Sequence, residues 1–283
     1  MNQKSLSLIL GLITIFCWGS LATFGNLLLH LPPFYILGVT FLIGSIPAFF
    51  RVREMFPDWK ILLWGVFGYF GYHFFLFYSF RFAPAVEANL INYLWPVIMV
   101  LATPLAFPGE KLKAYHWFGA FLSVVGCLVL VLGKGVALQA SNLGGYGLAL
   151  LAAFTWPLYS IGKKKMGKTS VWAVGGFCFV AGILCLGTHA LIEPRVVLQT
   201  KDAGLLLLMG VGPFGIAFYC WDLALSKGDA RVIGALAYLT PVLSTLGLVF
   251  FAGQVLETST LTGMILIITG ASAGLLDFFP SKS

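Results

Sequence analysis

Ten apolar stretches divide this chain, and each is long enough to cross the hydrocarbon core of a membrane. A core of about 30 Å requires about 20 helical residues. Because lipid offers the backbone no hydrogen-bond partner, only helices or closed barrels can cross it, and these runs lack the alternation of barrel strands. Hydrophobic residues make up 59% of the sequence and charged residues 10%. We therefore predict an all-α polytopic membrane protein with ten transmembrane helices, at residues 5–29, 33–50, 60–82, 84–107, 114–133, 145–162, 171–191, 204–225, 230–251 and 258–279.

The second half of the chain repeats the first at an offset of 145 residues. The sequence NYLWPV at 92–97 aligns with AYLTPV at 237–242, and matching glycines continue the alignment once one residue is omitted. Five helices per copy is an odd number, so the second copy enters the membrane in the opposite direction. This pattern predicts two inverted five-helix repeats around a central cavity, an arrangement typical of transporters. We expect the first repeat at 1–133, a linker at 134–144 and the second repeat at 145–283.

Lys and Arg are distributed unevenly among the predicted loops. If the N-terminus is cytoplasmic, the cytoplasmic segments contain 13 of the 17 basic residues and the external loops contain four. Cytoplasmic loops of membrane proteins are enriched in basic residues, so both termini are predicted to be cytoplasmic. The net charge of +7 then reflects topology and anionic lipid. We expect the lipid bilayer among the partners and no nucleic acid.

Three short segments resemble a known family of transporters. They are the GEKL turn at 109–112, the INYLWP run at 91–96 and the YLTPVLS run at 238–244. Together with the two repeats, they are similar to the drug/metabolite transporter superfamily, specifically its EamA-type members and the YddG group of bacterial aromatic amino acid exporters. The resemblance implies that helices one to four and six to nine enclose the cavity, while helices five and ten are peripheral.

These observations predict a secondary-active transporter that moves small metabolites across the bacterial inner membrane by alternating access. Amino acid export is favoured, with aromatic amino acids as the first choice. The alternative is a carrier of another small polar or cationic metabolite, such as choline or a different amino acid. A His-Glu-x-x-His metal motif is absent and the cysteines lack metal-binding spacing, so we expect no enzyme, no cofactor and no metal site. A monomer is expected.

Polar and aromatic residues share faces of several predicted helices. In the fourth helix Asn89, Asn92, Tyr93 and Pro96 follow helical spacing, and polar groups on that face would be costly in contact with lipid. Trp18 and Trp156 lie near the middle of their helices, where a ring can stack on a planar solute. The predicted substrate-binding residues are Trp18, His73, Asn92, Tyr93, Trp156, Tyr159, Tyr219, Tyr238 and Thr240. Tyr115 and Leu261, on the peripheral helices, are expected to lie outside the cavity.

Two prolines occupy equivalent positions in the repeats. Pro96 and Pro241 each leave a backbone carbonyl without its helical partner and permit a bend, so both are predicted gating positions. The alternative is that they only kink packed helices.

Ionisable side chains are rare within the predicted helices. Glu87 and Asp222 could meet a substrate ammonium group or carry a proton; alternatively, they are solvated or pair with Arg81 or Arg231. His73 has either an interior functional role or a packing role.

Overall fold

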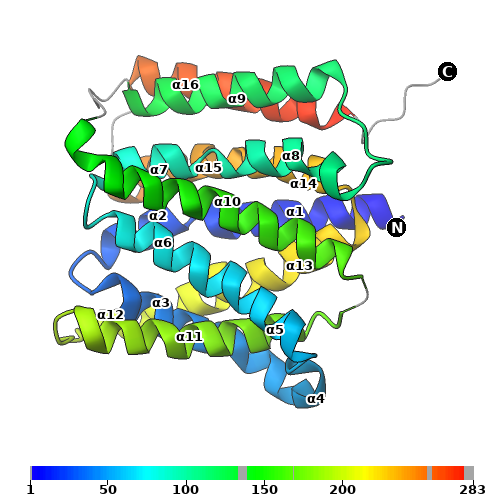
Figure 1. Cartoon of the computed structure of the whole chain (residues 1–283). Coiled ribbons are helices and arrows are strands. Elements are labelled where there is room, and N and C mark those ends of the chain that lie inside the picture. The colour runs from blue at the N-terminus through cyan, green and yellow to red at the C-terminus, as the bar shows by residue number, and fades with distance from the viewer. Residues whose placement is uncertain (1, 133–138, 168, 254–256, 277–283) are drawn as a thin grey trace.

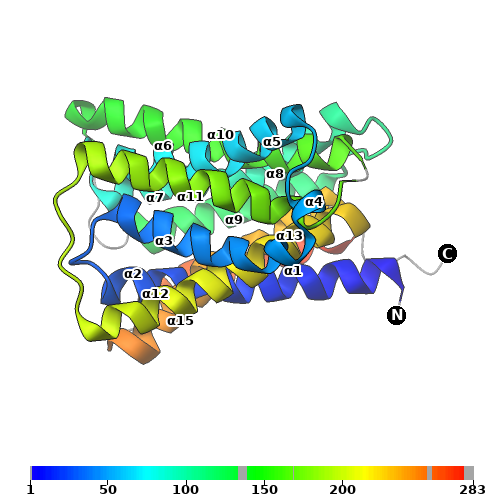
Figure 2. The ribbon, with the colours of Figure 1, turned by 90° about the horizontal axis from the view of Figure 1, so that it is seen from below.

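The protein is a bundle of helices in the computed structural model, which describes residues 2–132, 139–167, 169–253 and 257–276. Within these ranges there is no strand. Most of the long helices lie side by side and run along one common direction (Figures 1 and 2). The α-helices of the first half are α1 (Gln3–Gly19), α2 (Leu21–Leu27), α3 (Pro33–Ser45), α4 (Val52–Met55), α5 (Trp59–Val66), α6 (Tyr72–Ser79), α7 (Ala85–Asn92), α8 (Trp95–Ala106) and α9 (Ala114–Leu132). Those of the second half are α10 (Leu143–Lys165), α11 (Ala173–Ile192), α12 (Thr200–Val211), α13 (Ala217–Lys227), α14 (Ala230–Ala237), α15 (Leu239–Ala252) and α16 (Thr258–Gly274).

Many of these helices are suited to a membrane. In the described part of the chain, seven helical segments are long and apolar enough to span one: Gln3–Leu27, Pro33–Met55, Trp59–Ser79, Ala85–Ala106, Ala173–Ile192, Thr200–Lys227 and Ala230–Phe251. They coincide with seven of the ten predicted spans. Two further predicted spans fall on shorter apolar helices, Ala114–Val129 and Thr258–Gly274, and another falls on α10, which has 23 residues.

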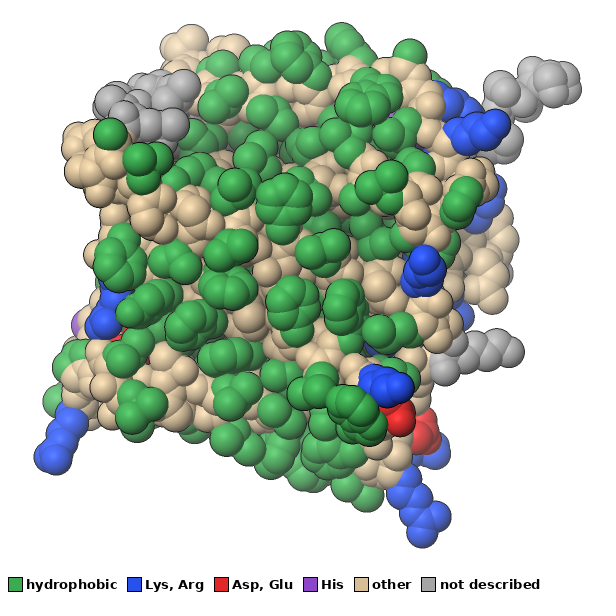
Figure 3. Space-filling view, in the orientation of Figure 1, with side chains coloured by type: hydrophobic (Ala, Val, Ile, Leu, Met, Phe, Trp, Pro, Cys, Tyr) green, Lys and Arg blue, Asp and Glu red, His purple; other side chains and the backbone are tan. Residues whose placement is uncertain are grey.

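The surface agrees with this composition. Hydrophobic side chains cover much of the face shown in Figure 3, whereas Lys and Arg gather toward the ends of the helices. Large apolar residues project outward, among them Phe50, Leu105 and Phe250, which are 87%, 85% and 78% exposed. Such a surface is stable in lipid and unstable in water. The prediction of an all-α, multi-pass membrane protein is confirmed.

Four interruptions of the long helices occur in pairs. The π-helical turns η2 (Phe67–Gly71) and η4 (Gly212–Ile216) begin 145 residues apart. The α7–α8 and α14–α15 breaks lie just before Pro96 and Pro241, which have no N–H to donate to the carbonyl four residues earlier. π-Turns and proline bends occur frequently at functional sites in membrane helices. The remaining short turns are η1 (Ile46–Arg51) and η3 (Ala140–Asn142).

One pair of helices lies at the edge of the bundle, where it packs on α7, α8, α14 and α15. α9 and α16 pack along each other at the top of Figure 1. α1 packs on α13 and α10 packs on α6, while α3 packs on α11. The large aromatic core lies among these last three pairs and includes none of the residues of α9 and α16.

A close helix approach gives a test of the packing. A Cβ atom added at Gly176 of α11 would overlap the carbonyl oxygen of Met55 in α4, and a backbone atom cannot rotate away as a side chain can. Gly176→Ala is therefore expected to destabilise the fold by about 1–3 kcal/mol, as overpacked cores do. The thermal unfolding temperature in detergent measures this effect. Gly187→Ala, in the same helix with open space around it, is the control and is expected to leave that temperature unchanged or raise it. Equal unfolding temperatures for the two variants would contradict the packing described.

Candidate substrate cavity

A cavity of about 520 Å³ lies between the broken helices. At its inner end it is lined by Trp18, Trp95 and Trp156, and at its other end by residues near the ends of α2 and α6. Leu29, which lines the latter end, is 77% exposed. We name this the open end; it is on the left in Figure 1. The volume is in the range of sites for small ligands.

Most of the predicted site residues lie on this cavity. Seven of the nine proposed substrate-binding residues line it, together with both proposed gating prolines: Trp18, His73, Asn92, Tyr93, Trp156, Tyr238, Thr240, Pro96 and Pro241. The stripe on the fourth helix faces the cavity at all four of its positions. Tyr115 and Leu261 are not among the lining residues.

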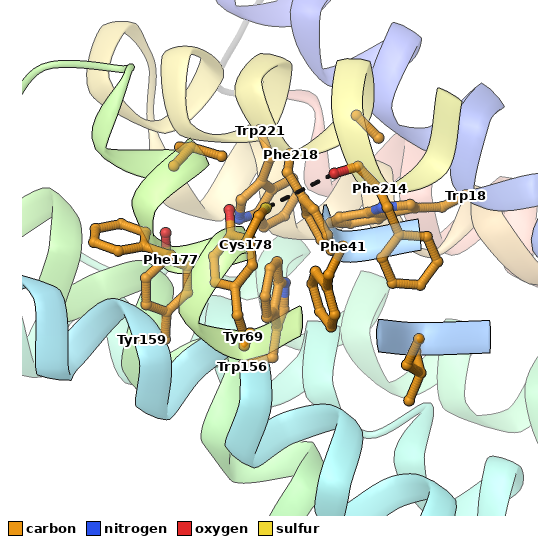
Figure 4. Close-up of a cluster of buried hydrophobic side chains, with 14 of the residues drawn as sticks. Trp18, Phe41, Tyr69, Trp156, Tyr159, Phe177, Cys178, Phe214, Phe218 and Trp221 are labelled. Atoms are coloured by element: carbon orange, nitrogen blue, oxygen red, sulfur yellow. Dashed lines mark hydrogen bonds between the residues drawn. The ribbon is translucent and has the colours of Figure 1, made fainter. Parts of the chain in front are cut away.

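Tyr159 and Tyr219 lie outside the cavity, contrary to the prediction. Tyr159 packs behind Trp156, against Tyr69 and Phe177 (Figure 4), with ring centroids 5.3 Å and 6.3 Å away. Tyr219 turns toward α11, where its ring lies 6.1 Å from that of Trp172. For Tyr219 the reason is the helical period, which turns the direct neighbour of the lining residue Phe218 to another face. Tyr159 shares a face with Trp156 but lies one turn further along α10, where Tyr69 and Phe177 cover its ring.

An aromatic layer closes the inner end of the cavity. Trp18 contacts Trp95, Trp156, Phe218 and Trp221, at centroid distances of 6.2, 5.7, 6.0 and 5.0 Å. We call these five residues the aromatic floor (Figure 4 shows all but Trp95). The Trp18 indole N–H also donates to the Pro213 carbonyl, over 3.3 Å.

The sequence reasoning missed several residues of this region. Phe218, which lines the cavity, lies 145 positions after His73, so the repeat offset contained the signal for it. Trp95 directly precedes Pro96 and was present in the motif. Tyr72 lines the cavity beside His73 and accepts a hydrogen bond from Asn92.

The polar groups of the cavity are uncharged. The Asn92 Nδ2 donates to the Tyr72 hydroxyl over 3.0 Å, while the Asn92 Oδ1 and the hydroxyls of Tyr238 and Thr240 are buried without a protein partner. His73 Nδ1 lies 2.7 Å from the Tyr69 carbonyl, which can only accept, so the proton is on Nδ1. The lining residues include no Asp, Glu, Lys or Arg. The lining residues thus carry an amide acceptor and two hydroxyls that lack a protein partner, beside aromatic faces.

Glu87 and Asp222 have partners that the sequence did not suggest. Glu87 accepts hydrogen bonds from the Tyr146 hydroxyl and from Asn142. Asp222 pairs with Lys163 over 2.8 Å, and both side chains are buried. The pairing alternatives with Arg81 and Arg231 are wrong: Arg81 donates to the Ile192 carbonyl, and Arg231 pairs with Asp229. Neither carboxylate lines the cavity.

Beyond the aromatic floor, further ionic contacts join the loops at the other end, which we name the closed end. Lys164 contacts Glu110 over 3.5 Å and donates to the Gly228 carbonyl over 2.8 Å. Burial raises the pKa of Glu110, with a further contribution from the nearby charge of Asp229. Burial opposes ionisation of Asp229 as well, but its hydrogen bonds to Arg231 outweigh that effect and lower its pKa. These contacts tie α10, the α8–α9 loop and the α13–α14 loop together.

Two sequence patterns typical of soluble enzymes occur in the chain, and the structure assigns neither to its usual role. Residues 162–169 have the spacing of a phosphate-binding loop, but Gly162 lies inside α10, whereas such a loop precedes a helix. Lys168 is outside the described residues. Residues 270–274 read Gly-x-Ser-x-Gly, but Ser272 lies within α16 and donates to the Ile268 carbonyl. A nucleophilic serine of that motif stands on a strand-to-helix turn. Over the described ranges, no three His, Cys, Asp or Glu side chains are grouped to hold a metal.

Apolar membrane helices, paired helix breaks and a cavity between them define a polytopic membrane transporter. The EamA-like transporter family matches residues 5–132 and again residues 143–273, and the chain belongs to this family. It is therefore a transporter of a small-molecule substrate and is embedded in the membrane. The resemblance noted in the sequence is confirmed.

Relatives of similar length match nearly the whole chain. It is 34% identical to the aromatic amino acid exporter YddG of Ancylobacter novellus, a match that covers 96% of this chain and 97% of that protein. It is 25% identical to a probable amino-acid metabolite efflux pump of Salmonella typhimurium, over 95% and 94% of the two chains. The crystal structure of another protein superposes with a TM-score of 0.92 at 32% identity, covering 99% of this chain and all of the other.

Proposed function

We propose that this protein exports amino acids, with aromatic amino acids favoured, by secondary-active alternating access across the bacterial inner membrane. The observation that carries the proposal is the uncharged cavity of about 520 Å³, which has aromatic rings at its base and lining residues whose buried polar atoms lack a protein partner. An aromatic side chain can stack on Trp18 or Trp156, while Asn92 Oδ1 accepts from an ammonium group and the Tyr238 and Thr240 hydroxyls donate to a carboxylate. The names of two full-length relatives support amino acids as the substrate class.

The proposed architecture is ten membrane crossings in two inverted repeats, 1–133 and 145–283, joined by a linker at 134–144. The double family match and the 145-residue spacing of η2 and η4 support it. α1 and α10, the first helices of the two repeats, run in opposite directions across the bundle (Figure 1). Two such halves around one cavity are the structural basis of alternating access.

The proposed orientation follows from charge. Among the described basic residues, Arg81, Arg195 and Lys201 belong to the loops of the open end, whereas α10 and the loops of the closed end hold many more. We assign the closed end and both termini to the cytoplasm. The structure then corresponds to an outward-open state, ready to release an exported solute. The chain is proposed to act as a monomer without a cofactor.

One observation favours a second candidate, a carrier of a small cation such as choline. Aromatic side chains without a carboxylate can form a cage that binds quaternary ammonium groups. The cavity has several such rings. A zwitterionic amino acid uses the same rings and also the hydroxyl donors, so we rank it first.

Counterflow in reconstituted vesicles distinguishes these functions. Vesicles loaded with unlabelled phenylalanine are expected to accumulate labelled phenylalanine transiently and saturably, without ATP, and choline is expected to compete poorly. Faster counterflow with choline than with phenylalanine would support the second candidate. Linear flux without counterflow would indicate a channel and would overturn the carrier proposal.

A further inference from the structure

A buried ion pair lies on the side of the aromatic floor that faces away from the cavity. Lys163 is on α10, seven residues after Trp156, and Asp222 is on α13, next to Trp221 of the floor. Their charged atoms are 2.8 Å apart and the residues are only 6% and 5% exposed. The pair joins α10 to α13 at the closed end, and neither residue lines the cavity.

The repeat relates these two positions to the open mouth of the cavity. Trp156 aligns with Trp18 at an offset of 138 residues, and the same offset aligns Lys163 with Gly25. The offset of 145 residues aligns Asp222 with Phe77. Gly25 and Phe77 both line the cavity toward its open end. If the halves exchange conformations, Lys163 and Asp222 come to line the mouth when the closed end opens. This step rests on the proposed alternating access.

Opening the closed end has an electrostatic consequence. The two charges neutralise each other in the present state, and separating them leaves two partly buried charges without partners, which is unfavourable. A zwitterionic amino acid restores both interactions, with its carboxylate at Lys163 and its ammonium group at Asp222. A plain amine or a plain carboxylate restores only one.

We infer that Lys163 and Asp222 form a second substrate site at the closed end, which takes up both charged groups of a zwitterionic α-amino acid. The ion pair is the form of this site without substrate. The opposite mouth has Gly25 and Phe77 at the matching positions and therefore holds a zwitterion less strongly. The protein thus has a charged entrance, an uncharged central cavity and an apolar exit, an order that suits export.

Competition with modified phenylalanines tests this site. Phenylalanine methyl ester keeps the ammonium group and lacks the carboxylate, whereas N-acetylphenylalanine keeps the carboxylate and lacks the ammonium group. Each is added against labelled phenylalanine in counterflow. The variants are Lys163→Met, Asp222→Asn and the double variant, which leaves no unpaired charge and so guards against misfolding. Lys165→Met, an exposed position on the same helix, is the matched control.

The single variants are expected to shift specificity in opposite directions. In Lys163→Met, phenylalanine binding should weaken about tenfold relative to binding of the methyl ester. In Asp222→Asn, phenylalanine binding should weaken about tenfold relative to binding of N-acetylphenylalanine. Each change corresponds to the loss of one charge-assisted hydrogen bond. The double variant should lose at least as much phenylalanine affinity as either single variant, without a preference between the two analogues. Lys165→Met should match the wild type.

Two results would overturn the inference. If binding of all three compounds changes by the same factor in each single variant, the pair is only a latch that holds the end closed. If the double variant keeps wild-type phenylalanine affinity, the site does not contact substrate. Failure of the proposed function can be distinguished from failure of this inference, because the wild-type protein itself would then show no phenylalanine counterflow.

Discussion

Trp156→Ala is expected to lower the affinity for phenylalanine at least about tenfold, which corresponds to ~1.4 kcal/mol. Trp156 lines the cavity and is 3% exposed, and its ring lies 5.7 Å from each of the rings of Trp18 and Phe218. Its loss removes a stacking surface and opens a hole in the aromatic floor. Equilibrium binding to purified protein in detergent measures the effect. The ratio of phenylalanine to alanine affinity should fall as well, because alanine has no ring to stack.

Trp172→Ala is the matched control. Trp172 packs on Tyr219 outside the cavity, so its removal deletes the same side chain without touching the proposed site. Truncating a buried Trp costs about 3–5 kcal/mol of stability, so the unfolding temperature of Trp156→Ala is measured alongside and Trp156→Phe serves as a milder variant. Wild-type phenylalanine affinity in a folded Trp156→Ala protein would exclude a stacking role.

Pro96→Ala and Pro241→Ala are expected to slow exchange about tenfold while binding stays within about threefold, ~0.65 kcal/mol. Each proline follows a helix break and lines the cavity. Alanine restores a backbone N–H, which can bond to the carbonyl four residues earlier and straighten the helix. If the helix bends at this position during the transport cycle, the straightened helix resists that motion. The exchange rate then falls while the contacts with substrate persist. Initial exchange rates in vesicles, compared with equilibrium binding, separate the two effects.

Pro104→Ala provides the control for these variants. Pro104 lies in the same helix as Pro96, inside α8, but does not line the cavity. We expect it to exchange substrate near the wild-type rate. If Pro96→Ala and Pro241→Ala also exchange at that rate, the prolines are packing features and the gating proposal is wrong.

The amino-acid sequence by itself determined the class of protein and the positions of the two helix breaks at Pro96 and Pro241, but not the two π-helical turns. Runs of about 20 apolar residues can satisfy their backbone in lipid only as helices, so the membrane helices followed from local composition. The stripe from Asn89 to Pro96 also followed, because helical spacing places these residues on one face and polar groups avoid lipid. The repeat offset located Tyr238 and Pro241 in the same way.

Only the tertiary structure decided which face of each helix turns to the cavity. Tyr159 and Tyr219 have the same chemistry as the lining tyrosines, but packing turned them toward Phe177 and Trp172. Packing also made Lys163 the partner of Asp222, whereas the sequence analysis had considered Arg81 and Arg231. Helical periodicity relates residues three and four apart, whereas these choices depend on contacts between helices far apart in the chain. The uncharged cavity and the buried ion pair beyond its floor were therefore visible only once the helices were packed.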